Sequence, residues 1–412
     1  MRGAARRPVL AALSVIVVVV TLLVATGSAL AIATVPDATI TAAFASGEPV
    51  LPEVSATAAI LIDAASGEIL FSKNANARLP MASTTKIMTA IVVLETLDPQ
   101  QKVTVSANAV SVEGSKASLV KGEVLTVDQL LHGLLIISGN DAAIALAEAA
   151  GGSVKGFVDM MNAKTKEMGL KNTRFVNPHG VQPKGADKNN HYSSANDLAT
   201  MTRYAQQFEL FREIVDSESI TLPAAPGQQK PRYWDHNGNE LLMDLGWVTG
   251  VKTGSTPYAK YCLVASGNRD GVSMISVVLG AETSDIRWRE SRSLLEYGFD
   301  LRPRTVLINP RQEIVDLELT DILGRSVTVV SDRSLAARLH KGDIVTRSVS
   351  IDREPSVPVA AGEVLGHATF RLAGTTLGTV NLVAAQPVTR PTLRMIVYHW
   401  RACSPVRLRY GS

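Results

Sequence analysis

Ser83-Thr84-Thr85-Lys86 is the stretch from which the fold and the chemistry of this 412-residue chain can be argued. Apolar residues follow it at helical spacing, namely Ile87, Ala90, Ile91 and Leu94. This spacing predicts a helix that begins at Ser83, and residues three apart on a helix share one face. The Lys86 amine is therefore expected beside the Ser83 hydroxyl. A serine hydroxyl becomes a good nucleophile only when a base lies within hydrogen-bond reach.

Two further short motifs lie downstream, Ser138-Gly139-Asn140 and Lys252-Thr253-Gly254. Each motif is weak evidence alone, because an S-x-x-K is usually an N-cap followed by a surface lysine. The chain also holds a second S-G-N at Ser266-Gly267-Asn268, which we interpret as a turn between two strands. The three motifs in this order are the signature of penicillin-reactive serine acyltransferases. Burial and the charge of Lys252 are expected to lower the pKa of Lys86 so that it can accept a proton.

Residue patterns around the first two motifs predict the elements that carry them. Residues 58–62 and 68–71 are expected to form a β-hairpin that leads into the S-x-x-K stretch. Thr126 and Gln129 have the spacing of a capping box. The apolar run that follows predicts a helix, and this helix should deliver Ser138 to a loop at its end.

The K-T-G motif is followed by two apolar segments, 261–265 and 272–279. These segments predict antiparallel strands, with the K-T-G on or entering an edge strand that faces the cleft. Residues 287–299 have a helical period and should return to cover the sheet. From Thr305 onward, short alternating apolar segments are separated by Gly, Asp and Pro, which predicts a small all-β domain.

The chain resembles the low-molecular-mass penicillin-binding proteins, which are serine-type D-alanyl-D-alanine carboxypeptidases of the peptidase S11 group. The resemblance covers roughly residues 51–388 and rests on five blocks of sequence: 82–89, 137–142, 172–180, 193–199 and 250–254. It implies an α/β (α+β) fold of the penicillin-binding and β-lactamase-like transpeptidase type. In this fold an antiparallel sheet is flanked by helices, one group of which forms a helical subdomain. A small all-β C-terminal domain, without a catalytic constellation, is expected to follow.

The resemblance also implies catalytic roles. Ser83 would attack the carbonyl between two D-alanines of a peptidoglycan stem pentapeptide, and Lys86 would take its proton. Ser138 together with Lys252 would pass a proton to the leaving D-alanine, and water would then release the acyl-enzyme. β-Lactam antibiotics would acylate the same serine. No cofactor or metal is implied, and His179 and His191 are interpreted as structural because zinc needs three or four convergent ligands.

Six positions are expected to contact the substrate: Asn140, Lys252, Thr253, Gly254, Ser255 and Arg287. Asn140 would bond the backbone amide of the substrate or, alternatively, hold its own loop. Lys252 and Thr253 suit the terminal carboxylate. The backbone N–H groups of Ser83, at a helix N-terminus, and of Ser255 would bind the oxyanion. Arg287 either adds positive charge to the carboxylate subsite or is a solvated arginine at a helix end.

Composition and charge favour a globular protein whose excess positive charge lies near its C-terminal end. The chain is 46% hydrophobic and 19% charged, with a net charge of +3, and these values give no reason to expect a nucleic-acid partner. No acidic residue follows Glu363 while several arginines do, which suits an anionic lipid or wall-polymer surface. Cys262 and Cys403 are the only cysteines. We expect no disulfide between them, and Cys262 should be a small core residue.

Five regions are predicted along the chain. Residues 1–31 are read as a secretory signal peptide or a retained N-terminal anchor, because basic residues precede an apolar run and small residues. Residues 32–50 are a predicted linker, 51–302 the serine D,D-peptidase domain, 303–388 the β-rich domain and 389–412 a basic tail. Within the tail, residues 393–400 either lie in a membrane interface or are disordered. The catalytic domain is expected to be extracytoplasmic, secreted or membrane-associated.

Other functions share parts of this pattern. A serine β-lactamase has the same three motifs, and class A enzymes activate the deacylating water with a glutamate in an omega loop. Glu167 is a glutamate in the corresponding part of the chain, but the residues around it do not match such a loop. A D,D-endopeptidase would use the same site on cross-linked wall. A catalytically silent wall-binding protein is a third alternative, which the intact Ser83 and Lys86 disfavour.

Overall fold

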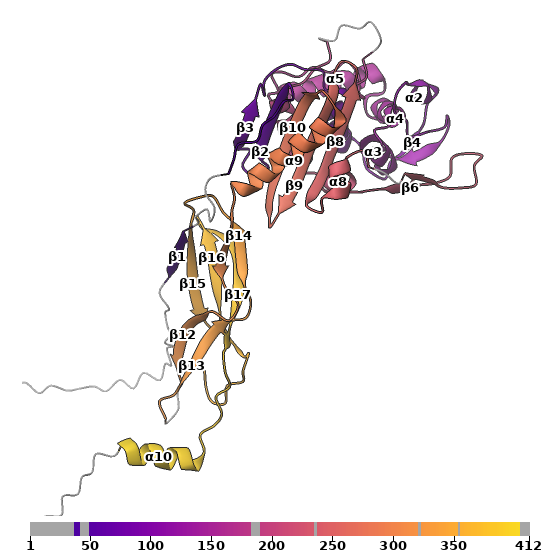
Figure 1. Cartoon of the computed structure of the whole chain (residues 1–412). Coiled ribbons are helices and arrows are strands. Elements are labelled where there is room, and N and C mark those ends of the chain that lie inside the picture. Colours follow the sequence, from indigo (N-terminus) through magenta and orange to yellow (C-terminus); the bar gives the residue numbers. More distant parts are fainter. Residues whose placement is uncertain are drawn as a thin grey trace, which may run out of the picture.

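The computed structural model describes residues 37–41, 49–182, 190–234, 237–319, 323–352 and 355–403. Figure 1 shows a larger body of sheet and helices, a slimmer body of strands beneath it, and helix α10 at the far end. The predicted signal peptide at residues 1–31 and the last part of the predicted tail, residues 404–412, lie outside the described residues.

The larger body is built on a five-stranded antiparallel sheet with the order β3-β2-β10-β9-β8. Its strands are β2 (Ala58–Asp63), β3 (Ile69–Lys73), β8 (Val248–Thr256), β9 (Lys260–Arg269) and β10 (Val272–Ala281). Along β2, Leu61 packs on the side of helix α9 (Ser284–Asp300), whereas Ile60 belongs to the core on the opposite side. Both faces of the sheet are therefore covered, and this explains the near-continuous apolar run in its central strands.

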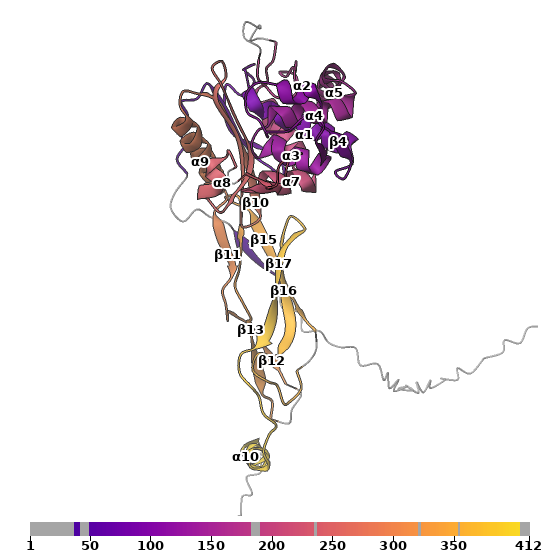
Figure 2. The same ribbon diagram turned by 90° about the vertical axis from the view of Figure 1, so that its right-hand side faces the viewer.

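A helical layer covers the face opposite α9, as Figure 2 shows. It contains α1 (Lys86–Thr96), α2 (Ala107–Ser111), α3 (Val127–Leu135), α4 (Asn140–Gly151), α5 (Val154–Glu167), α6 (Ala195–Ala205) and α7 (Glu209–Val215). Helix α3 begins at the predicted capping box, in which Thr126 and Gln129 bond each other's backbone reciprocally. The smaller elements are β4 (Lys102–Thr104), β5 (Val124–Thr126), β6 (Ile220–Leu222), β7 (Arg232–Trp234) and α8 (Glu240–Asp244).

The slimmer body confirms the all-β pattern predicted after Thr305. Its six-stranded sheet has the order β1-β15-β16-β17-β13-β12, and β11 pairs with β14 beside it. The strands are β1 (Ala38–Thr41), β11 (Arg304–Ile308), β12 (Glu313–Glu318), β13 (Ser326–Ser331), β14 (Leu335–Arg338), β15 (Ile344–Ile351), β16 (Val364–Leu372) and β17 (Thr375–Ala384). A separate apolar core, which includes Val329, Phe370 and Leu382, holds these strands together.

Strand β1 corrects the expectation that residues 32–50 form only a linker. It pairs antiparallel with β15, with Ala38 opposite Arg347 and Thr41 opposite Ile344. Its residues alternate between half-buried and exposed, and Ile40 packs against the core of the slimmer body. Four residues whose side chains alternate between the two faces are enough to pair with the edge of a sheet. A stretch this short cannot be recognised as a strand from the sequence.

The second S-G-N also differs from its prediction. Ser266-Gly267-Asn268 lies within β9 rather than in a turn. The chain reverses at Asp270 and Gly271, where φ is +51° and +83°, and Asp-Gly is a favoured pair for a two-residue hairpin turn that needs positive φ at both positions. Gly267 instead admits the ring of Trp247, which lies 2.9 Å from the position that a Cβ would take.

Ionic contacts join the two bodies. Arg302 follows α9, is 4% exposed, and donates to Glu68 at 3.0 Å while its guanidinium contacts the His340 ring of the slimmer body. In the opposite direction, Arg338 of β14 donates to Asp270 in the β9–β10 turn at 3.0 Å. The two arginines, Arg302 buried and Arg338 half-buried, cross-link the junction through the exposed Glu68 and Asp270. The junction lies at the end of the sheet where β9 turns into β10.

Helix α10 (Leu393–Cys403) follows the slimmer body. The alternative of a disordered tail is therefore wrong for this segment, since it is helical. None of the helices in the described part of the chain has the length and apolar character needed to span a membrane.

Candidate active site

Ser83 lies in a short 3₁₀ turn, η1 (Ala82–Thr85), that runs directly into α1. The predicted helix start at Ser83 is thus close to the observed one, with the serine in the tighter turn that precedes it. The Lys86 Nζ lies 3.0 Å from Ser83 Oγ, as the S-x-x-K spacing predicts. Two further acceptors hold the amine, Asn140 Oδ1 at 2.7 Å and the His179 carbonyl oxygen at 3.0 Å.

The environment of Lys86 favours a neutral amine. Its side chain is completely buried, and burial lowers the pKa of Lys86 well below the usual 10.5, as does the charge of Lys252. The carboxylate of Asp141 acts in the opposite direction and raises that pKa. Among the described residues, every hydrogen-bond partner of the Lys86 amine is a neutral oxygen. Lys86 is therefore equipped to accept a proton from Ser83.

Ser138 and Asn140 approach from the junction of α3 and α4. Ser138 has a φ of +62°, and its Oγ is buried with no hydrogen-bond partner among the described residues. Asn140 begins α4 and is 1% exposed; its Oδ1 accepts from Lys86 and its Nδ2 donates to the Glu113 carbonyl at 2.6 Å. Both ends of this amide are therefore engaged within the protein, in keeping with the alternative that Asn140 holds its surroundings in place.

Strand β8 supplies the K-T-G from the edge of the sheet, as predicted. A Cβ at Gly254 would lie 3.0 Å from the backbone nitrogen of Ser83, so only a glycine lets the strand approach the serine turn this closely. Lys252 is 2% exposed, and burial together with the charge of Arg287 lowers its pKa to about 7. Thr253 is half-buried and Ser255 is exposed at the end of the motif.

Arg287 is not the solvated helix-end residue that one alternative described. It is 7% exposed and donates from Nη2 to Ser284 Oγ at 3.0 Å. Its guanidinium carbon lies 3.9 Å from the centre of the Trp288 ring and 5.5 Å from that of Tyr261. Arg287 adds positive charge to the K-T-G end of the site, and this charge lowers the pKa of Lys252.

The histidines contribute to the site in ways that the sequence patterns did not identify. His179 acts through its main chain, whose carbonyl accepts from Lys86. The His191 Nδ1 accepts from the Val176 N–H at 3.1 Å, so its Nε2 donates to Thr85 Oγ1 at 2.8 Å and braces the serine turn. Burial lowers the pKa of His179 to about 3 and that of His191 to about 4. The signal in the sequence was that His179 lies within the 172–180 block and that His191 comes shortly before the 193–199 block.

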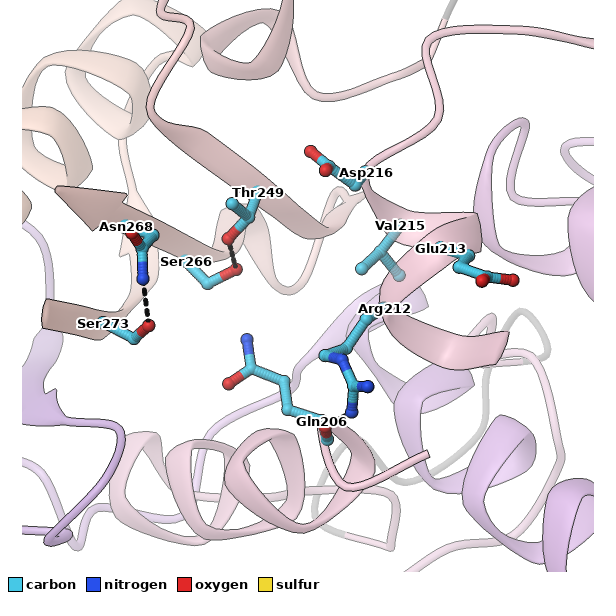
Figure 3. Close-up of a pocket in the computed structure, with 9 residues that line it drawn as sticks. All are labelled: Gln206, Arg212, Glu213, Val215, Asp216, Thr249, Ser266, Asn268 and Ser273. Atoms are coloured by element: carbon cyan, nitrogen blue, oxygen red, sulfur yellow. Dashed lines mark hydrogen bonds between the residues drawn. The ribbon is translucent and has the colours of Figure 1, made fainter. Parts of the chain in front are cut away.

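A cavity of about 340 Å³ lies apart from these residues, between the end of α6, helix α7 and strands β8 to β10 (Figure 3). Thr249 and Ser266 share a hydrogen bond of 2.8 Å in its wall, and Asn268 donates to Ser273 at 2.8 Å. Val215 also lines it and packs against Gly250, just before the K-T-G. None of the predicted site residues lines this cavity.

Comparison with known proteins agrees with this geometry. The profile of peptidase family S11, D-alanyl-D-alanine carboxypeptidase, matches residues 43–283. The D-alanyl-D-alanine carboxypeptidase DacF of Bacillus subtilis is 33% identical over 81% of this chain and 86% of its own length. DacC of Escherichia coli is 33% identical over 84% of this chain and 88% of its own length.

Solved structures give the same answer for the fold. The D-alanyl-D-alanine carboxypeptidase DacD of Francisella tularensis has a TM-score of 0.58 and 27% identity, covering 84% of this chain and 96% of that one. Penicillin binding protein 5 of Haemophilus influenzae has a TM-score of 0.56 and 30% identity, covering 83% of this chain and 99% of that one. The predicted fold class is thus confirmed, and the chain belongs to the peptidase S11 family of serine-type D-alanyl-D-alanine carboxypeptidases.

Proposed function

We propose that this carboxypeptidase removes the terminal D-alanine from peptidoglycan stem pentapeptides through an acyl-enzyme on Ser83. The observation that carries the proposal is the buried Lys86 amine, which lies 3.0 Å from Ser83 Oγ and whose pKa burial lowers. Lys86 takes the hydroxyl proton while Ser83 Oγ bonds to the carbonyl carbon of the penultimate D-alanine. The negative charge that develops on the carbonyl oxygen is bound by the N–H groups of Ser83 and Ser255.

The leaving group requires a proton, and Ser138 with Lys252 supplies it. The Ser138 Oγ has no partner among the described residues and is free to bond the departing amine. Lys252 has a pKa of about 7, so its protonated and neutral forms are both present near neutral pH. The C–N bond breaks, D-alanine leaves as the amine, and water then attacks the ester to restore Ser83. Thr253 and Arg287 provide a hydroxyl and a positive charge for the terminal carboxylate.

Acylation by a labelled penicillin followed by mass spectrometry tests the nucleophile. A β-lactam ring opens on the same hydroxyl, so one adduct is expected on the peptide that contains Ser83 and none in the Ser83→Ala variant. Ser266→Ala is the matched control, because Ser266 lies in the second S-G-N and should leave the adduct intact. Release of free D-alanine from a stem pentapeptide must accompany the adduct. An acylated protein that releases no D-alanine and cleaves cross-linked wall instead would be a D,D-endopeptidase.

The β-lactamase alternative depends on activated water at the acyl-enzyme. Glu167 lies at the end of α5, and its exposed carboxylate accepts from Lys164 at 2.8 Å. This ion pair gives Glu167 a surface role and no tie to Ser83. We therefore expect the penicillin adduct to persist far longer than one catalytic turnover on a peptide. Rapid release of hydrolysed penicillin by the wild-type protein would favour the lactamase instead.

We propose further that the protein works on the wall side of a membrane, with α10 lying on the lipid surface. The exposed side chains of α10 include Leu393, Val397 and Tyr398, and Leu393 with Val397 shares one face of the helix. Arginines before and within the helix, Arg390 and Arg394, suit anionic headgroups. Deletion of residues 389–412 from protein with a cleaved leader should abolish binding to anionic vesicles. Unchanged partitioning would reject the lipid contact.

A further inference from the structure

The loop at residues 113–123 is fastened along the start of helix α4. The Asn140 N–H donates to the Ser115 carbonyl at 2.8 Å, and the Asn140 side chain donates to the Glu113 carbonyl at 2.6 Å. A Cβ at Gly114 would lie 2.7 Å from Asn140 Nδ2. The loop thus presses directly against the amide that holds Lys86, and its position decides where that amide points.

Asp141 is the residue that holds this loop from inside. It is completely buried, and its Oδ1 accepts from the Ala117 N–H at 2.7 Å while its Oδ2 accepts from the Leu119 N–H at 3.1 Å. Its Oδ1 also accepts from the Ala142 N–H at 2.9 Å. No ion pair of Asp141 occurs within the described ranges of the chain. A buried carboxylate whose oxygens all bind backbone N–H groups fixes the loop in one position.

The hydrogen bonds form a continuous path to the base. Asp141 holds the loop, the Glu113 carbonyl of the loop accepts from Asn140 Nδ2, and Asn140 Oδ1 therefore faces the Lys86 amine at 2.7 Å. If the Asn140 side-chain amide rotated by 180°, its NH₂ group would face the Lys86 amine. The N–H of Lys86 that now donates to Asn140 Oδ1 would then have no acceptor there. The loop therefore selects the orientation of Asn140 that receives a hydrogen bond from Lys86.

We propose that Asp141 is a positioning residue for acylation of Ser83: its carboxylate fixes the 113–123 loop, which orients Asn140 and through it the Lys86 amine. The inference rests on the proposed function, since it concerns the same serine chemistry. Asp141 does not touch the substrate. It acts through Asn140, and it adds a negative charge close to the base.

The negative charge of Asp141 affects the pH dependence of the acylation rate, which a purely structural residue would leave unchanged. The charged groups that shift the pKa of Lys86 are Lys252 from β8 and Asp141 from α4. His179, whose carbonyl accepts from Lys86, is the neighbouring titratable group, and the charge of Lys86 helps burial to lower the pKa of its ring. Asp141 raises the pKa of Lys86, whereas Lys252 lowers it. Acylation needs the neutral amine, so its rate falls on the acidic side as Lys86 becomes protonated. Removal of the negative charge lowers the pKa of Lys86, and this acidic limb moves to lower pH.

Asp141→Asn tests the inference at constant size, and Asp197→Asn is its matched control. Asp197 is also a buried aspartate in the first turn of a helix, α6, and it accepts from the Asn172 N–H at 2.8 Å. It is not among the groups that shift the pKa of Lys86. The second-order rate constant for acylation by a fluorescent penicillin is measured from pH 5 to 10 for both variants and the wild-type protein, with urea unfolding to record stability.

We expect Asp141→Asn to lose about 100-fold in acylation rate, the order of effect that a misplaced catalytic group produces, and its acidic limb to move to lower pH. Asp197→Asn should lower stability and leave the limb where it is. The same limb and a rate within threefold of wild type for Asp141→Asn would overturn the inference. A wild-type protein that penicillin does not acylate would instead refute the proposed function.

A second variant releases the same loop from its other end, which keeps the inference testable if Asp141→Asn does not fold. Arg232 forms an ion pair with the buried Glu123 and donates to the Ser118 carbonyl at 3.2 Å, and Glu123 Oε2 accepts from the Val120 N–H at 3.0 Å. Arg232→Gln should reduce the acylation rate several-fold with the acidic limb unmoved, because no charge near Lys86 changes. An unchanged rate would show that the loop does not control the base.

Discussion

Gly180→Ala tests the rigidity of the serine turn from outside it. Gly180 follows His179, whose carbonyl accepts from Lys86, and it has a φ of +91°. A Cβ at Gly180 would lie 1.9 Å from the Ala82 carbonyl oxygen, 2.4 Å from its carbonyl carbon and 2.8 Å from Thr85 Oγ1. All three atoms belong to the turn that carries the nucleophile. The turn therefore cannot give way without displacing the reacting hydroxyl.

The size of the effect follows from the geometry. Cβ atoms essentially never approach another heavy atom closer than 3.0 Å, so relief of the 1.9 Å contact requires a movement of about 1.1 Å. A displacement of about 1 Å at a catalytic group costs on the order of 100-fold in rate. The positive φ adds about 1–2 kcal/mol of backbone strain for a residue with a side chain. We expect acylation of Gly180→Ala to be about 100-fold slower and its unfolding free energy to fall by at least that strain.

Gly169→Ala separates strain from displacement. Gly169 has a φ of +67°, but a Cβ there would meet no atom within 4 Å, so this variant carries the strain alone. The assay is the time course of fluorescent penicillin bound to each protein, with urea unfolding as the measure of stability. Both variants should be destabilised, and only Gly180→Ala should acylate slowly. Equal acylation rates in the two variants would refute the argument that the turn is held in place by close packing against Gly180.

Three further outcomes follow from charge and burial. Arg287→Gln removes a cation that lowers the pKa of Lys252, so that pKa should rise and the alkaline limb of the acylation profile should move to higher pH. Lys252→Met should abolish peptide turnover and raise stability. Burial lowers the pKa of Lys252 from 10.5 to about 7, so between these pH values the unfolded chain binds a proton that the native state does not. The resulting loss of unfolding free energy grows as pH falls from 10.5 to 7 and reaches about 5 kcal/mol. The unfolding free energies of wild type and variant, measured in urea, should therefore differ most below pH 7 and converge above pH 10.5. His191 has a pKa lowered by burial from 6.5 to about 4, so its contribution is complete above pH 6.5 and is lost as pH falls towards 4, by about 3 kcal/mol. His191→Gln should flatten this part of the stability profile, and an equally steep decline in the variant would assign the loss to other groups.

Elements with strong local signals could be predicted from the sequence. The capping box at Thr126 depends on residues three apart, and it appeared as expected at the start of α3. The contact between Lys86 and Ser83 depends on one turn of chain. The K-T-G was expected on an edge strand because apolar strands follow it, and β8 is the edge. Cys262 is fully buried in β9, as a small core residue should be. For the cap and for the Lys86–Ser83 contact, the deciding interactions are between near neighbours in sequence.

Features that depend on distant partners could not be predicted in this way. The orientation of Asn140 depends on a carbonyl 27 residues earlier, in the loop that Asp141 holds. The environment of Arg287 includes Tyr261 of β9, whose ring centre lies 5.5 Å from the guanidinium carbon, whereas the sequence position of Arg287 suited a solvated helix end equally well. Strand β1 depends on pairing with β15 at the other end of the chain. Tertiary contacts of this kind override weak local preferences.

The local chemistry of Lys86 explains why its surroundings are tightly fixed. A carboxylate in direct contact would hold the amine as an ammonium, and the ammonium cannot accept the proton of Ser83. In the described part of the chain, Lys86 instead bonds three neutral oxygens, and the carboxylate of Asp141 binds backbone N–H groups. A buried amine without an ion pair is destabilising, so it stays in place only if its acceptors cannot move away. The close packing at Gly180 and the loop anchored by Asp141 provide that constraint. Both constraints come from residues outside the three sequence motifs.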